Sequence, residues 1–159
     1  MVSDNRRVNG ARDTQGVPNR WVMIYWSGLH DATHVAERRT GRVAAGMFMI
    51  APELSGILSS DGLWETLNTR LGTLFDDWEE EALVPSQLAQ AAKVVSDFCR
   101  RNYSQATDSI ERVVADRVSP PAGPVVARST GRQMCGLLEE LAQFLEDSAG
   151  LGRTVEFEL

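Results

Sequence analysis

Residues 153–159 read RTVEFEL, and this short stretch decides the fold class of the chain. Polar Thr154, Glu156 and Glu158 alternate with apolar residues, which is the period of a β-strand with one buried and one solvated face. Near the other end of the chain, residues 21–26 read WVMIYW, an apolar run typical of a strand buried on both faces. We expect the C-terminal strand to pair with this N-terminal strand and to form an edge of the sheet.

Between these two strands the apolar residues recur at spacings of three and four, which predicts helices. The longest stripe follows Ser60 and Asp61, which can cap a helix, and continues to Trp78. Pro85 suits the first turn of a second helix. The four predicted helices cover residues 63–78, 85–101, 110–114 and 129–148.

The remaining segments complete the predicted architecture. Residues 32–39 fit either one short helix or a strand, and we favour a strand that pairs with 42–50 through a turn at Thr40-Gly41. The prediction is an α+β fold: a small antiparallel sheet of N-terminal strands and the C-terminal strand, packed against about four α-helices. Residues 1–19 are polar and are expected to form a flexible arm, and 20–159 are expected to form a single α+β domain.

Charge and composition narrow the classes of function. The 159 residues include 16 basic and 22 acidic side chains, a net charge of −6, which argues against direct binding to nucleic-acid backbones. Fifteen of the basic residues are arginines and only one is a lysine, which points to a GC-rich bacterial genome. No apolar stretch approaches the roughly 20 residues of a membrane span, so no membrane partner is expected.

The two cysteines and the absence of a secretory signal bear on the compartment. Cys99 and Cys135 fall on or beside the apolar faces of predicted helices, and we interpret them as buried free thiols. A disulfide is not needed in a chain long enough to build a hydrophobic core. The sequence therefore predicts a protein of the reducing cytoplasm.

Motifs for catalysis are absent from the sequence. It contains no Gly-x-Ser-x-Gly nucleophile elbow and no phosphate-binding glycine loop, so we expect a protein that is not an enzyme and uses no cofactor. His30 and His34 would share one face of a helix, with Glu37 a turn further on, and could then hold a metal. On a strand the two histidines would lie about 13 Å apart. We interpret them as solvated polar groups and predict no metal site.

The acidic run at residues 76–81, DDWEEE, is the strongest candidate for a functional surface. It contains five carboxylates, those of Asp76, Asp77, Glu79, Glu80 and Glu81. At the C-terminal end of the predicted helix 63–78 they would oppose the helix dipole, at a cost of a few tenths of a kcal/mol each. The run fits either a solvated helix end or a surface that binds a basic partner, and we take it as the predicted partner-binding site.

These features predict a small acidic protein-binding module that neutralises a partner protein by direct binding. The chain resembles bacterial immunity proteins and toxin inhibitors, but in size and charge only. Two alternatives stay open. The first is a chaperone or adaptor for a secreted protein, acting as a homodimer to which the C-terminal strand donates an edge. The second is a metal-dependent enzyme that uses His30 and His34.

Overall fold

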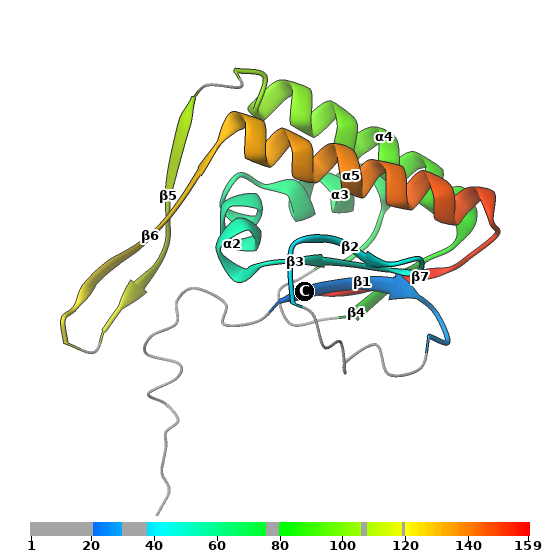
Figure 1. Ribbon diagram of the computed structural model, residues 1–159, viewed down its shortest axis with the longest axis horizontal. Helices are drawn as coiled ribbons and strands as arrows, with labels where there is room; N and C mark the ends of the chain where they lie inside the picture. Colours follow the sequence, from blue (N-terminus) through cyan, green and yellow to red (C-terminus); the bar gives the residue numbers. More distant parts are fainter. Residues whose placement is uncertain (1–20, 30–37, 76–79, 106–107, 119) are drawn as a thin grey trace, which may run out of the picture.

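The fold combines an open sheet, a layer of helices and a separate hairpin (Figure 1). The structure, a computed structural model, describes residues 21–29, 38–75, 80–105, 108–118 and 120–159. Helices lie against one face of the five-stranded antiparallel sheet, and the two-stranded hairpin projects to one side of the molecule. The predicted α+β class is confirmed. The predicted arm, residues 1–19, lies outside the described residues.

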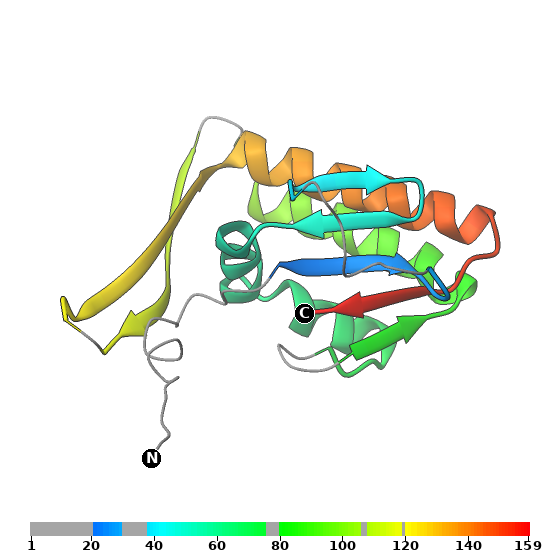
Figure 2. The ribbon, with the colours of Figure 1, turned by 60° about the horizontal axis from the view of Figure 1, so that its bottom comes forward.

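The sheet joins the two ends of the chain, as predicted. Its strand order is β2 (Gly41–Ala44), β3 (Met47–Ile50), β1 (Val22–Trp26), β7 (Val155–Glu158) and β4 (Glu80–Leu83) (Figure 2). Ile24 in β1 is paired with Phe157 in β7, so the pairing of the N- and C-terminal strands is confirmed. The prediction that β7 forms an edge is wrong, because β4 pairs along its other side.

The two faces of the central strand β1 differ in burial. Val22 and Ile24 point into the main core, whereas Met23 and Tyr25 are half-buried on the opposite face. The expectation of a strand buried on both faces is therefore wrong for one face. The described helices all pack on the side of Val22 and Ile24, although Met47 and Met49 of β3 are buried on the opposite face as well.

The first hairpin of the sheet lies wholly within residues 41–50. Its strands β2 and β3 are joined at Ala45 and Gly46, so the single strand predicted for 42–50 is wrong, and the predicted turn at Thr40-Gly41 stays untested. A Cβ atom on Gly46 would lie 2.6 Å from ring atoms of Trp26, so this turn needs a glycine. Most of the segment predicted as the partner strand, residues 30–37, lies outside the described residues.

Four helices are described: α2 (Pro52–Ser60), α3 (Leu63–Leu71), α4 (Pro85–Asn102) and α5 (Gly131–Gly150). The second and fourth predicted helices correspond to α4 and α5 and are confirmed. α5 begins two residues later than predicted, because the hydroxyl of Thr130 caps it by accepting the backbone N–H of Gln133 at 3.1 Å. α2 was not predicted from the sequence.

α3 ends much earlier than its apolar stripe suggested. Gly72 adopts a left-handed conformation, φ 69°, and stops the helix. Phe75 continues the helical spacing in the sequence, yet it lies in extended chain and is buried with its ring centroid 4.9 Å from that of Phe157. The predicted helix 63–78 is therefore wrong for residues 72–75, and residues 76–79 lie outside the described residues.

The third predicted helix is wrong, because residues 110–114 belong to a strand. β5 (Ser109–Arg117) and β6 (Gly123–Thr130) form the projecting hairpin (Figures 1 and 2). β-Branched Val113 and Val114 fit a strand better than a helix.

A disulfide joins Cys99 in α4 to Cys135 in α5, with Cα atoms 5.4 Å apart. The prediction of free thiols is therefore wrong. The two helices lie side by side and bring together cysteines 36 residues apart, a proximity that the one-dimensional pattern does not reveal. Cytoplasmic localisation loses this support and stays a prediction. Across the described part of the chain, no helix is both long and apolar enough to cross a membrane.

Candidate functional site

The face of the sheet turned away from the helices carries its own apolar cluster, which we call the outer face. Met47 and Met49 of β3 are buried at its centre, with relative exposures of 2% and 0%. Four partly buried apolar side chains pack around them: Trp21, Met23, Tyr25 and Val43. Met47 and Met49 present almost no surface, so only the four partly buried side chains are available to a partner. Tryptophan, tyrosine and methionine are enriched where proteins bind other proteins.

Beside this cluster the sheet becomes acidic. The strands β4 (EEAL) and β7 (VEFE) contribute Glu80, Glu81, Glu156 and Glu158, which we call the acidic edge, and their eight residues include no basic side chain. Glu80 is paired in register with Glu158, and Ala82 with Glu156. Glutamates in paired positions are unfavourable in general, so stability alone does not select this composition.

The acidic edge is continuous with the outer face. Glu156 and Glu158 alternate with the buried side chains of β7 and are half-buried on the outer-face side. Tyr25 is paired with Glu156, and its hydroxyl donates a hydrogen bond to Glu158. Glu81 is half-buried and paired with Phe157, so it lies on the helix side of the same edge. The carboxylates of Glu156 and Glu158 thus adjoin the aromatic ring of Tyr25, a combination that can bind a lysine or arginine.

The predicted site is only partly described. Asp76, Asp77 and Glu79 lie outside the described residues, whereas Glu80 and Glu81 open β4. Glu156 and Glu158 were recognised as strand residues but were not included in the site. Their alternation was visible in the sequence, but their proximity to Glu80 depends on the β4–β7 pairing, which the predicted helix 63–78 concealed.

A second polar centre joins three elements on the helical side. The carboxylate of Asp61, at the end of α2, accepts hydrogen bonds from the Tyr103 hydroxyl at 2.6 Å and from Nε of Arg112 at 2.5 Å. Burial, followed by the hydrogen bond to Asp61, raises the pKa of Tyr103 well above its ordinary value. The hydrogen bond to Asp61 raises the pKa of Arg112. Both oxygens of Asp61 are occupied, so this centre fastens β5 to the helices and is a structural feature.

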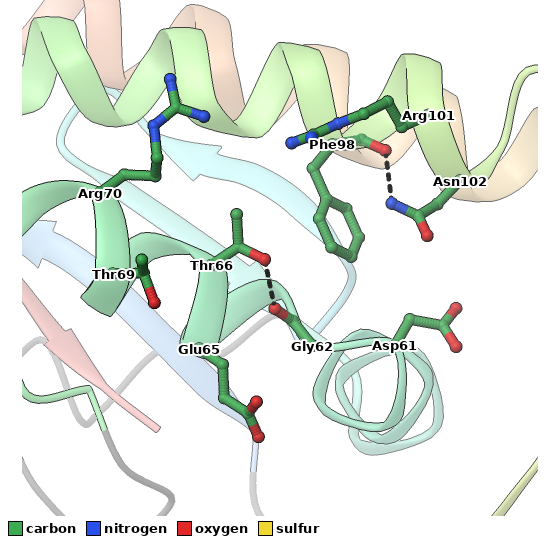
Figure 3. Close-up of a pocket in the computed structure, with 9 residues that line it drawn as sticks. All are labelled: Asp61, Gly62, Glu65, Thr66, Thr69, Arg70, Phe98, Arg101 and Asn102. Carbon is green, nitrogen blue, oxygen red and sulfur yellow. Dashed lines mark hydrogen bonds between the residues drawn. The ribbon is translucent and has the colours of Figure 1, made fainter.

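A groove of about 590 Å³ lies next to this centre, between α3 and the end of α4 (Figure 3). Figure 3 shows Arg70 and Arg101 on one side of the groove and Asp61 and Glu65 on the other, with the ring of Phe98 between them. Charges of both signs line it, so the groove favours no single class of ligand. We do not take it as the functional site.

A smaller hollow of about 490 Å³ lies where β1 and β2 meet the end of α5. Two of its lining residues are ion-paired, Arg42 and Asp147 at 3.1 Å, and the indole N–H of Trp26 donates to the neighbouring Ser148 hydroxyl at 2.9 Å. The hydrogen bond from Gln143, and then Arg42, lower the pKa of Asp147. These contacts hold α5 on the sheet.

The alternative of a metal site at His30 and His34 receives no support from the described residues. Among the described residues, no group of three or more histidine, cysteine, aspartate or glutamate side chains could hold a metal ion. His30, His34 and Glu37 themselves lie outside the described residues, so their role stays a prediction.

No protein-family model matches the chain, and no curated protein or solved structure matches it either. The residues described above therefore carry the functional proposal alone.

Proposed function

We propose that the protein is a small acidic protein-binding module that neutralises a basic partner by binding it at the acidic edge. The observation that carries this proposal is the composition of β4 and β7, four glutamates and no basic residue, directly beside the aromatic and methionine side chains of the outer face. Carboxylates at such a surface accelerate association with a basic protein and determine which partner binds.

The position of β4 strengthens the proposal. β4 is the last strand of the sheet among the described residues, so a partner can approach its free edge and its outer face, while Leu83 is buried in the main core on the helix side. Half-buried Tyr25 and Met23 supply contact area at the centre of such an interface, and the glutamates supply its charged rim. Charged side chains on an edge strand also discourage pairing with other chains, and the test must separate these two roles.

The test neutralises the acidic edge without disturbing the fold. The variant E80Q/E81Q/E156Q removes three carboxylates and leaves Glu158, which accepts the Tyr25 hydroxyl. Its matched control, E53Q/E65Q/E139Q, removes three exposed carboxylates from α2, α3 and α5. Both variants and the wild-type chain serve as baits in extracts of the source cells, and the captured protein is identified and purified.

The proposal predicts that the captured partner is basic and that the chain inhibits its activity in a fixed ratio. Neutralising the acidic edge is expected to slow association at low salt at least about tenfold and to flatten its salt dependence, with the control unchanged. Stopped-flow mixing measures both effects. Equal association rates for the two variants, or a partner bound elsewhere, would contradict the proposal. Aggregation of the edge variant with normal partner binding would assign the glutamates to edge protection.

A second candidate, a dimeric chaperone or adaptor for a secreted protein, is favoured by the projecting hairpin β5–β6. Val113 and Val118 expose 59% and 65% of their surface there, and exposed apolar side chains supply contact area for a second chain. This candidate predicts that the captured protein keeps its activity and is exported. The neutralising module predicts that the captured protein is inactive while bound.

A further inference from the structure

The hairpin β5–β6 forms a sheet of only two strands, and it projects beyond the helices (Figures 1 and 2). Its base is held by α2, where Gly56 closely approaches Val114, and by the Arg112–Asp61 ion pair at 2.5 Å. A two-stranded hairpin is marginally stable in water unless further strands or a helix extend it. The exposed Val113 and Val118 are available for such an extension.

The sequence of β5 is complementary to itself when two copies run antiparallel. Residues 110–118 read IERVVADRV. With Val114 placed opposite its own copy, the facing pairs are Ile110 with Val118, Glu111 with Arg117, Arg112 with Asp116, and Val113 with Ala115. Every acidic residue then faces a basic one, and every apolar residue faces an apolar one. Such cross-strand pairs are the units that stabilise a sheet.

This complementarity selects one register. A shift by one residue in one direction places Glu111 opposite Asp116, and a shift in the other direction places Arg112 opposite Arg117. Like charges in facing positions are unfavourable, so both slipped registers are disfavoured. A single register that is related to itself by a two-fold axis gives a closed dimer.

We propose that β5 pairs with β5 of a second copy of this chain across a two-fold axis at Val114, to form a four-stranded sheet. α2 contacts the face of the hairpin through Gly56, which leaves the outer edge of β5 open among the described residues. The other edge strand, β6, contains Pro124, which cannot donate a backbone hydrogen bond. The bulge of β5 lies at the proposed axis, between Val113 and Ala115.

The charged residues of β5 remain accessible to the second copy. Glu111 forms an ion pair with Arg128 at 3.1 Å, and its side chain is 57% exposed. Arg112 keeps 37% of its side chain exposed beside Asp61, and a guanidinium has donors for two carboxylates. The dimer leaves the acidic edge on a different part of the molecule, so this inference does not depend on the proposed function (Figure 2).

The test exchanges charges across the proposed axis. E111R places arginine opposite Arg117, and R117E places glutamate opposite Glu111, so each single variant is expected to raise the dimer dissociation constant at least about tenfold. The double variant E111R/R117E restores opposite charges and is expected to dimerise like the wild type. E111R and the double variant both lack the Glu111–Arg128 ion pair, so recovery of the dimer in the double variant reports the contact between copies and not this pair.

Sedimentation equilibrium of the full chain measures these constants, with the wild type expected at twice 17.5 kDa. An equimolar mixture of E111R and R117E provides the second measurement, because the two chains are complementary and are expected to form a mixed dimer more tightly than either alone. Circular dichroism confirms that each variant is folded. A wild-type chain that stays monomeric at high concentration, or single variants that dimerise as the wild type does, would overturn the proposal.

Discussion

The paired helices α4 and α5 and the hairpin β5–β6 are directly joined in the chain but are stabilised in different ways. The helices bury long apolar stripes in the main core and are cross-linked by Cys99–Cys135. The hairpin is fastened at its base and carries exposed valines at 59% and 65% toward its tip. Cooperative stability therefore resides in the helical layer, while the hairpin is available for binding.

The largest expected effect comes from the disulfide that only the helical layer contains. A cross-link between residues 36 apart is expected to stabilise the fold by about 4 kcal/mol, so C99A/C135A should lose most of that amount. Urea unfolding with and without reductant measures the loss, and the variant must itself be insensitive to reductant. Wild-type protein whose stability is unchanged by complete reduction would contradict the contrast between the two regions.

A valine-to-alanine substitution in the helical layer and one in the hairpin compare the stability of the two regions directly. Val95 in α4 is fully buried, whereas Val113 in β5 is 59% exposed. We expect V95A to lower the free energy of unfolding by about 2–3 kcal/mol, and V113A to change it by less than about 0.5 kcal/mol. Urea unfolding at one low protein concentration measures both. Equal losses would show that the hairpin belongs to the same cooperative core.

A smaller effect is expected where the two regions are fastened together. Y103F removes the hydroxyl that donates to Asp61, and the remaining Arg112 contact limits the loss to about 1–2 kcal/mol. The pKa of Tyr103 is raised in the folded state, so its hydroxyl stabilises the fold fully below pH 10.0, and that contribution is lost as pH rises above this value. As the pH rises above 10.0, the free energy of unfolding should fall less steeply in Y103F than in the wild type. If the free energy of unfolding depends on pH identically in Y103F and the wild type, Tyr103 does not contribute to this pH dependence.

Secondary structure was predicted most accurately where one apolar pattern persists over many residues. α4 and α5 keep their apolar spacing over 18 and 20 residues, and the two terminal strands have clear β patterns. α3 was extended too far because Phe75 continues the helical spacing by coincidence, although Gly72 was a visible stop signal. In β5, the spacing of Ile110, Val113 and Val114 fits a short helix as well as a strand.

The candidate site was less predictable than the fold. Glu80 and Glu81 belong to a strand that glutamate does not favour, so the acidic run gave no strand signal. Glu156 and Glu158 join them through the pairing of residues more than 70 positions apart. The Cys99–Cys135 disulfide likewise depends on how α4 and α5 pack. Such contacts arise from the three-dimensional arrangement, which periodicity in a single sequence does not encode.

Native mass spectrometry of the untagged protein recovered from its source cells tests the central claim most directly. We predict a complex in which each chain binds one basic protein. The variant E80Q/E81Q/E156Q should lose that protein, and the control E53Q/E65Q/E139Q should keep it. Two copies of the chain in the complex would agree with pairing through β5. Recovery of an acidic partner, or of a basic partner retained equally by both variants, would contradict the claim that the acidic edge is the binding surface.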